Sequence, residues 1–357
     1  MKIVQLLPTV AYGDAVSNDA LAMRGIIRSM GYPSEIYADI LIGSNIKDYG
    51  ILNFNDLLLS PNDILIYHLS IGSRLNYLIE KFHCKKIMVY HNITPSSYFL
   101  GYDPNTFSIT KKGVAEAIHL NNKFDYCLAD SEFNKQDLLN YGYKCNIDVL
   151  PVIVPFSDYD KKPSKKILRK YADHMTNILF VGRGAPNKKI ENVIATFSQY
   201  YKNYNSQSRL FIVGHWNGMG KYKAQLDDYV CKLGMHNVVF TGHVGFEDLL
   251  SYYKLADVFV CMSEHEGFCV PLVEAMHFDI PIVARAHAAV PYTLGGSGIL
   301  LNEYSPLLAA GAIDLLVNNS TLRKNIIAGQ RERLRDFSYP VLKAKFESYL
   351  NNFIRGE

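Results

Sequence analysis

The feature that most constrains the fold is an alternation, present twice in the chain, between short apolar runs and longer helix-like segments. In the first half the apolar runs include KIVQLLP (2–8), DILIYHL (63–69) and KIMVYHN (86–92). The alternation restarts with TNILFVG (176–182) and continues to PIVARA (281–286). Continuous apolar strands separated by helices are typical of parallel sheets covered on both faces. The sequence therefore predicts an α/β protein with two doubly wound, Rossmann-like domains.

A break in this pattern indicates where the two domains join. The chain has 357 residues, which is long for one compact core. The segment 155–172 contains Pro163 and a basic run, and we interpret it as a linker with a solvated helix; a membrane-surface patch is the alternative. The predicted domains are 1–160 and 172–340, and a C-terminal helix, 341–357, is expected to pack back on the first.

Composition excludes several classes of function. The net charge of +3 gives no basic surface of the kind that binds nucleic acid. The six cysteines form no CxxC pair and no cluster at zinc spacing, which favours reduced thiols in a cytoplasmic protein. No apolar run approaches the roughly 20 residues of a membrane span, and the N-terminus does not resemble a signal peptide. We expect a cytoplasmic protein that lies, at most, on the inner face of the membrane.

Two acids flank a turn in the stretch EHEGFCVPLVEAM (264–276), which follows the apolar run DVFVCM. Gly267 and Phe268 form the predicted turn, and Pro271 suits the first turn of a helix. Glu266 then lies at the edge of the sheet, and Glu274 lies in the first turns of the helix. Open backbone N–H groups at such a helix start favour phosphate, and carboxylates nearby accept hydrogen bonds from sugar hydroxyls.

Other strand ends carry polar groups that could face the same ligand. Arg183 and Lys188 follow one strand of the second half and could hold a diphosphate. In the first half, Gly13 precedes a capped helix without a GxGxxG pattern, and His91 ends a strand, with His68 as a weaker candidate. Strand ends that we expect to form a base pocket carry Gly214, His215, Gly242, His243 and Val244.

These motifs together resemble the retaining glycosyltransferases of the GT-B type, specifically the family 4 group. The most specific mark is a Glu, seven residues and a second Glu, here Glu266-GFCVPLV-Glu274, and the FVGR…K element matches at Arg183 and Lys188. The resemblance implies two domains facing each other across a cleft. It also implies transfer of a hexose from a nucleoside-diphosphate sugar, linked to UDP or GDP, to an acceptor hydroxyl with retained anomeric configuration.

The resemblance also implies a role for each matching residue. Glu274 would hold the ribose hydroxyls, and Glu266 would lie near the donor sugar. Arg183 and Lys188 would neutralise the diphosphate, with His91 at the donor sugar or the transition state. The remaining donor contacts would come from Gly13, Gly182, Gly267, Phe268, Cys269 and Val270.

The expected enzyme needs no cofactor and no metal. The string Asp158-Tyr159-Asp160 is a DxD pattern that can hold a divalent ion elsewhere, but here it lies in the predicted linker. Tyr292 stands where the family commonly has Glu, which keeps open a catalytically degenerate nucleotide-binding partner of a glycosyltransferase assembly. A sugar-nucleotide epimerase and a hydrolase with two acids are further alternatives. We expect a saccharide or lipid-linked saccharide acceptor, in bacterial surface polysaccharide or glycoconjugate synthesis, and no nucleic-acid partner.

Overall fold

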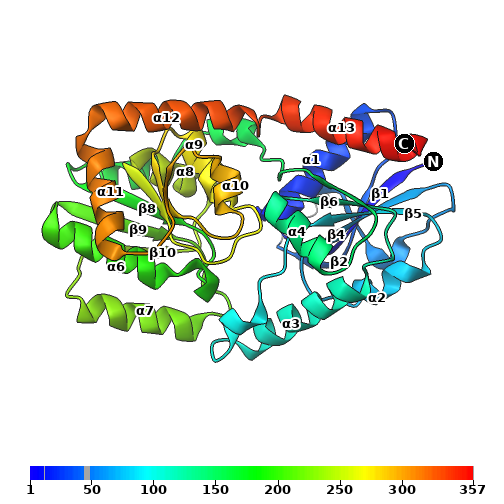
Figure 1. Ribbon diagram of the computed structural model, residues 1–357, viewed down its shortest axis with the longest axis horizontal. Helices are drawn as coiled ribbons and strands as arrows, with labels where there is room; N and C mark the ends of the chain where they lie inside the picture. The colour runs from blue at the N-terminus through cyan, green and yellow to red at the C-terminus, as the bar shows by residue number, and fades with distance from the viewer. Residues whose placement is uncertain (12, 44–48, 357) are drawn as a thin grey trace. The chain divides into compact units, whose positions relative to one another are not determined.

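The computed structural model describes residues 1–11, 13–43 and 49–356, which divide into two compact units (Figure 1). The first comprises Met1–Ser96, Phe107–Pro155 and Asp336–Glu357, and the second comprises Ser97–Thr106 and Phe156–Arg335. The prediction of domains at 1–160 and 172–340 did not anticipate that Ser97–Thr106 groups with the second unit. The chain therefore passes between the units more often than a single linker would allow.

The described part of the first unit contains a seven-stranded parallel sheet in the order β3-β2-β1-β4-β5-β6-β7. Its strands are β1 (Ile3–Ala11), β2 (Ile36–Ile42), β3 (Ile51–Asn53), β4 (Ile64–Leu69), β5 (Lys85–Tyr90), β6 (Tyr126–Ala129) and β7 (Asn146–Val149). The strand order reverses between β1 and β4. Ligands of open parallel sheets bind at the carboxyl ends of the strands beside such a reversal.

Helices cover both faces of this sheet. Helix α1 (Ala15–Ser29) and helix α13 (Tyr339–Arg355) share one apolar cluster, to which α13 contributes Leu342, Phe346 and Leu350 at helical spacing. Helices α2 (Leu75–Leu78), α3 (Pro104–His119) and α4 (Glu132–Asn140) contribute to the cluster on the other face. The C-terminal helix thus completes the core of the first unit.

The second unit repeats the architecture with six described strands in the order β10-β9-β8-β11-β12-β13. These strands, all parallel, are β8 (Thr176–Val181), β9 (Ser208–Val213), β10 (Val238–Gly242), β11 (Val258–Cys261), β12 (Ile282–Arg285) and β13 (Ile299–Leu301). Here the order reverses between β8 and β11. The loops that follow these two strands are therefore where a ligand is expected.

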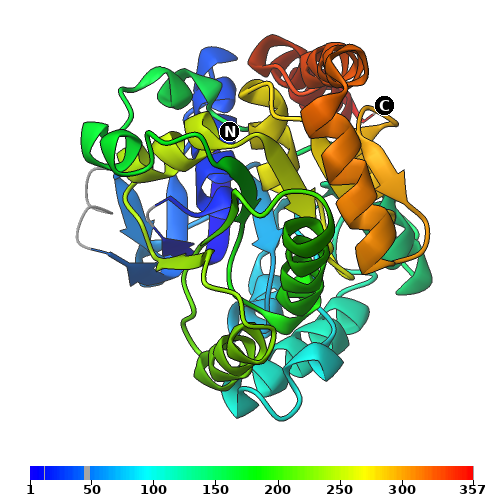
Figure 2. The same cartoon turned by 90° about the vertical axis from the view of Figure 1, so that its left-hand side faces the viewer.

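The helices of the second unit also form two layers. One layer consists of α5 (Lys165–Lys170), α8 (Phe246–Leu255), α9 (Val270–His277) and α10 (Val290–Leu294), which share one apolar cluster with the sheet. Helices α6 (Ile190–Asn203) and α11 (Pro306–Asn318) pack side by side against the sheet, as Figure 2 shows. Helices α7 (Gly220–Lys232) and α12 (Ser320–Arg335) complete the unit.

The segments 96–113 and 155–172 both contain helical structure. The segment 96–113 contains a 3-10 turn at Ser96–Phe99 and the first part of α3. The segment 155–172, interpreted as a linker with a solvated helix, contains α5 with no buried residues, while Tyr159 is buried and Tyr171 joins the core of the second unit. Aromatic side chains in a basic segment allow its backbone to pack while the lysines stay outside.

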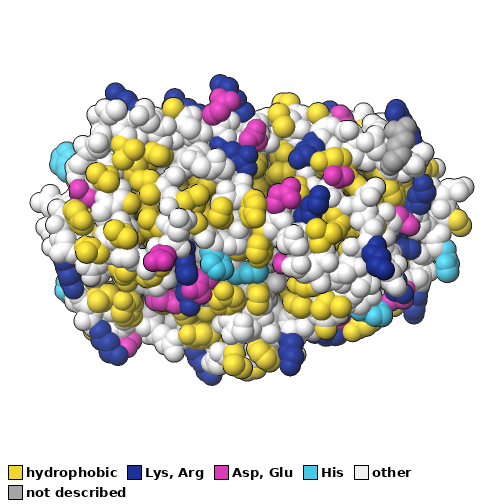
Figure 3. Space-filling view, in the orientation of Figure 1, with side chains coloured by type: hydrophobic (Ala, Val, Ile, Leu, Met, Phe, Trp, Pro, Cys, Tyr) yellow, Lys and Arg dark blue, Asp and Glu magenta, His cyan; other side chains and the backbone are white. Residues whose placement is uncertain are grey.

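The surface shows no large area of one charge on the face drawn in Figure 3, where basic and acidic side chains are interspersed. Within the described ranges, every helix is too short or too polar to cross a bilayer.

Candidate functional site

The strand-order reversal of the second sheet gathers the loops in which the sequence predicted a diphosphate site. The loop after β8 carries Arg183 and leads into the 3-10 helix Pro186–Lys188, and the loop after β11 carries Glu266. The strands β8 and β11 pair directly, so both loops leave the same edge. The side chain of Asn187 donates to the carbonyl of His265 at 3.0 Å, which ties the two loops together.

Lys188 and Glu266, the cation and the acid predicted for this edge of the sheet, form an ion pair. The Nζ atom of Lys188 donates to both carboxylate oxygens of Glu266, at 2.7 and 2.6 Å. The two side chains are only 19% and 8% exposed. Burial alone would lower the pKa of Lys188, but the negative charge of Glu266 outweighs it and the net pKa is raised. Lys188 is therefore charged at neutral pH.

Two further groups beside this pair have defined charge states. Burial lowers the pKa of His265 to about 4, so its ring is neutral at pH 7. Glu264 accepts from Arg285 at 2.7 Å and lies 3.3 Å from Lys189. Burial raises the pKa of Glu264, but these cations lower it by more. The loop after β11 is thus held by cations on both of its acids.

Helix α9 starts directly at the predicted donor-binding run, Gly267 to Val270. Cys269 precedes the helix in a left-handed conformation, with φ of +73°. The hydroxyl of Thr293 donates to the carbonyl of Phe268, which fixes the turn. Because the side chains of Phe268 and Cys269 are buried, this run offers a ligand mainly its backbone N–H groups. The helix dipole makes such groups favourable for an anion.

Glu274 lies one turn into α9, and its carboxylate is already bonded within the unit. The hydroxyl of Tyr159 donates to Oε1, and the hydroxyl of Tyr253 donates to Oε2 at 2.5 Å. Burial raises the pKa of Glu274, and the two hydroxyl donors lower it by less. Sequence reasoning missed both tyrosines. Tyr159 stands inside the DxD string of the predicted linker, and Asp158 of that string pairs with Lys161 at 3.0 Å.

The residues predicted for the base pocket follow the adjacent strands β9 and β10. The amide of Gly214 donates to the carbonyl of Gly242 at 3.2 Å, and the rings of His215 and His243 have centroids 6.5 Å apart. Gly214 has φ of +149°, and a Cβ there would lie 1.9 Å from the carbonyl oxygen of Gly182. The predicted glycines therefore let the ends of β8 and β9 approach closely. Val244 follows at the same edge and packs on the apolar cluster.

Arg183 and Tyr292 are exposed residues of the second unit. The pKa of Asp103 is lowered, first by its hydrogen bond from Thr106 and also by the charge of Arg183, so the two charges lie near each other. Tyr292 is 50% exposed on α10. Its ring therefore has no buried structural role.

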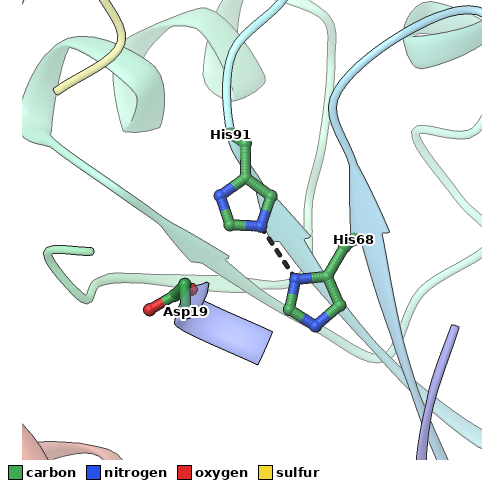
Figure 4. Close-up of side chains that lie close together, drawn as sticks. All are labelled: Asp19, His68 and His91. Atoms are coloured by element: carbon green, nitrogen blue, oxygen red, sulfur yellow. Dashed lines mark hydrogen bonds between the residues drawn. The ribbon is translucent and has the colours of Figure 1, made fainter. Parts of the chain in front are cut away.

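His91, the predicted catalytic residue of the first unit, belongs to a chain of hydrogen bonds. Its Nδ1 lies 3.0 Å from Asp130, and its Nε2 lies 2.8 Å from Nδ1 of His68. The other nitrogen of His68 lies 2.9 Å from the side-chain oxygen of Gln5. Figure 4 shows the two rings in line, with Asp19 beside them. The His91 side chain is 1% exposed and both its nitrogens are bonded, so its contact with a sugar stays a prediction.

The protons of this chain can be assigned from its far end. The amide nitrogen of Gln5 donates to the carbonyl of Ala20 at 2.9 Å, so the oxygen of Gln5 accepts from His68. His68 then has only Nδ1 to accept with, and His91 must donate to it. With Asp130 as acceptor on its other side, His91 carries two protons. Burial lowers the pKa of His91, but Asp130 and Asp19 outweigh it and the net pKa is raised.

Asp19 is the unexpected acid of the first unit. Its Oδ1 accepts from the amide of Ile153 at 2.8 Å, while Oδ2 is buried without a hydrogen-bond partner. Burial raises the pKa of Asp19 to about 7, and the positive charge of His91 opposes that rise. Gly13, just before the same helix, has φ of +75°, and an added Cβ would meet nothing within 4 Å. Glycine suits this turn because it adopts a positive φ without strain, not because space is short.

Two groups of metal-type ligand atoms occur among the described residues. In Asp19, His68 and His91, and in Cys261, Glu266 and Cys269, one atom of each residue lies within 4.8 Å of the others. In the first group the two ring nitrogens already share a hydrogen bond. In the second group both oxygens of Glu266 accept from Lys188. Neither arrangement presents three open lone pairs to an ion.

Curated relatives match parts of the chain. An uncharacterized glycosyltransferase of Methanocaldococcus jannaschii is 29% identical over 57% of this chain and 52% of its own length. The capsular polysaccharide biosynthesis glycosyltransferase CapM of Staphylococcus aureus is 27% identical over 49% of this chain and 46% of its own. The chain thus aligns with about half the length of these curated relatives.

A solved structure matches almost the whole chain. HepE of Anabaena, determined with UDP and glucose, superimposes with a TM-score of 0.76, covering 99% of this chain and 100% of its own, at 16% identity. This likeness establishes the GT-B fold. Residues 162–333, which hold Lys188, Glu266 and Glu274, match the family described as Glycosyl transferases group 1. In this region the chain is similar to the group 1 glycosyltransferases.

Proposed function

We propose that the chain transfers a hexose from a nucleoside-diphosphate sugar, linked to UDP or GDP, to an acceptor hydroxyl with retained anomeric configuration. The observation that carries the proposal is the meeting of Lys188, Glu266 and the start of α9 where the strand order of the second sheet reverses. This arrangement lies inside the family match. The structural neighbour HepE, solved with UDP and glucose, supports a nucleotide-sugar donor.

The chemical task in this reaction is to stabilise the diphosphate as it leaves. Lys188, Arg183 and the N–H groups at the start of α9 supply positive charge for the leaving oxygen. Each such donor contributes roughly 2–4 kcal/mol of barrier lowering in comparable sites. The phosphate oxygen takes the proton of the acceptor on the face from which it departs. Glu266 orients the sugar and holds Lys188, and it is not a nucleophile.

We further propose that donor binding needs no metal ion and no cofactor. The cations on the loop after β8 fill the role that a divalent ion would have, since Arg offers a planar fork and Lys a point charge to phosphate. The proposal places Glu274 at the ribose. It leaves His91 and Gly13, of the first unit, as contacts of the sugar and the diphosphate.

For the acceptor we propose a saccharide or lipid-linked saccharide of bacterial surface polysaccharide or glycoconjugate synthesis. The relative CapM, named for capsular polysaccharide biosynthesis, supports this class. The exposed basic residues of α5, such as Lys165 and Lys166, suit the anionic inner face of a membrane. The proposed location is therefore cytoplasmic and peripheral.

Thermal unfolding with nucleotides tests the donor site. The purified chain is heated with UDP, GDP or ADP, each with magnesium or with EDTA. A ligand at 100 times its Kd adds about 2.7 kcal/mol of stability, and we expect one nucleotide to raise Tm in EDTA. Glu274→Ala should abolish the rise. A rise only with magnesium would contradict metal-free binding, and binding without any sugar transfer would favour the degenerate partner that Tyr292 suggests.

A further inference from the structure

The carboxylate of Glu274 is bonded by two hydroxyl groups that differ in how firmly they are held. Tyr253 is 1% exposed in the last turn of α8, and its ring stacks on Phe278 with centroids 5.1 Å apart. Tyr159 comes from the short 3-10 helix Phe156–Asp160, the first residues of the second unit after the chain leaves Pro155. The hydroxyl of Tyr253 is part of a packed layer, whereas that of Tyr159 is supplied by a connecting segment.

The contacts of Tyr159 are mostly between rings. The centroid of its ring lies 5.3 Å from the ring centroid of Phe246, 5.6 Å from that of His277 and 5.7 Å from that of Phe156. These contacts need the ring and not the hydroxyl. Among the described residues, the hydroxyl of Tyr159 bonds Oε1 of Glu274. A Phe at this position would keep the packing and lose that bond.

The hydroxyls of Tyr159 and Tyr253 each donate to one carboxylate oxygen of Glu274. The two hydroxyl groups of a ribose could donate to a carboxylate in the same way. On the proposed function, Glu274 accepts from ribose, so a nucleotide must compete for oxygens that already hold phenol hydroxyls. Tyr253 cannot leave without disrupting α8, which makes Tyr159 the exchangeable donor.

We propose that the hydroxyl of Tyr159 occupies the position of one ribose hydroxyl on Glu274, and that a ribonucleotide displaces it on binding. This inference rests on the proposed function, and it makes Tyr159 a residue that sets donor affinity. It also links occupancy of the nucleotide site to the segment Phe156–Asp160, through which the chain enters the second unit.

Removing the hydroxyl should therefore tighten binding. In the absence of ligand, Tyr159→Phe leaves Oε1 of Glu274 buried without this donor, and a ribose hydroxyl restores it. Gaining or losing one hydrogen bond to a charged group changes an equilibrium constant by a factor of about 10 or more. We expect Tyr159→Phe to lower the Kd of the preferred nucleoside diphosphate about tenfold, with the far-UV CD spectrum unchanged.

Two controls assign the effect to the ribose. Tyr253→Phe removes the donor that stays in place, so it should weaken binding or leave it unchanged. The 2′,3′-dideoxy form of the same nucleotide lacks both hydroxyls, and its Kd should not fall in Tyr159→Phe. Binding is measured by calorimetry and by the fluorescence of Trp216, the single tryptophan, which follows β9 in the second unit.

The outcomes separate this inference from the proposed function. Tighter ribonucleotide binding in Tyr159→Phe, absent with the dideoxy form, supports the inference. Equal or weaker ribonucleotide binding in Tyr159→Phe, while the wild type binds, overturns the inference and leaves the proposed function standing. If neither the wild type nor the variant binds UDP, GDP or ADP, both are wrong.

Discussion

Lys188 donates hydrogen bonds to both carboxylate oxygens of Glu266, and neither side chain is more than 19% exposed. The two residues are far apart in the chain, and each follows one of the two paired strands β8 and β11. The pair therefore joins the two loops at the point where a ligand of this fold binds. Its geometry accounts for both the stability of the loops and the charge available to a diphosphate.

Breaking this pair from one side should be costly. Lys188→Met leaves Glu266 buried without its cation, and we expect the free energy of unfolding to fall by about 3 kcal/mol. The double variant Lys188→Met/Glu266→Gln buries no lone charge and should recover part of that loss. Urea unfolding of both single variants and the double variant measures the coupling. Additive losses would contradict a direct interaction.

The raised pKa of Asp19 predicts a pH dependence of stability in the first unit. Its folded pKa of about 7 lies above its ordinary value of 3.8, so the folded state holds the proton longer. The free energy of unfolding should therefore fall as pH rises from about 4 to about 7. Asp19→Asn should lack this component, which is at most about 4 kcal/mol since one pKa unit corresponds to about 1.4 kcal/mol. Parallel pH profiles of the variant and the wild type would show that the prediction is wrong.

His91 should carry two protons at neutral pH. Its pKa is raised above 6.5, so the stability that its charge provides is present below about that pH and is lost as pH rises through the folded pKa. Nitrogen-15 NMR of the imidazole should show both nitrogens protonated at pH 7. Asp130→Asn should lower this pKa more than Asp19→Asn, because Asp130 also bonds the ring. A His91 that is neutral in the wild type at pH 6 would refute the proton assignment.

Gly214 should not tolerate a side chain. A Cβ would lie 1.9 Å from the carbonyl oxygen of Gly182, so one of the two strand ends must move. We expect Gly214→Ala to lower the free energy of unfolding by roughly 3 kcal/mol. Gly220→Ala is the matched control, since a Cβ at the start of α7 meets nothing within 4 Å. Similar thermal midpoints for the two variants would contradict the close approach.

Much of the fold could be predicted from the sequence because buried parallel strands are apolar without interruption. The same regularity predicted which residues follow strand ends, and so Lys188 and Glu266 could be assigned to one edge before their contact was known. Glu274 was predicted to lie in the first turns of a helix beside them. The strands β3 and β13 escaped prediction because each has only three residues.

The partners of these residues could not be predicted, because they depend on side-chain directions and on segments far away in the chain. Tyr159 bonds Glu274, which lies 115 residues later in the chain. Tyr159 belongs to a segment whose basic composition predicted exposure to solvent. Asp130, which directly follows β6, bonds His91, and Asp19 of α1 lies beside the His91 ring. No periodicity in the sequence reports such contacts, since each is decided by packing between elements.

Donor turnover is the measurement that decides whether this chain is a retaining glycosyltransferase. The purified chain is incubated in EDTA with UDP- and GDP-linked hexoses and a lipid-linked saccharide mixture, and both nucleotide release and labelled product are followed. We expect one donor to be consumed, with formation of an α-linked product from an α-linked sugar nucleotide. We expect Lys188→Met to lower kcat/KM at least about 100-fold, as loss of one charge-stabilising donor does in other enzymes. Inverted product, or equal turnover by Lys188→Met, would contradict the proposed site.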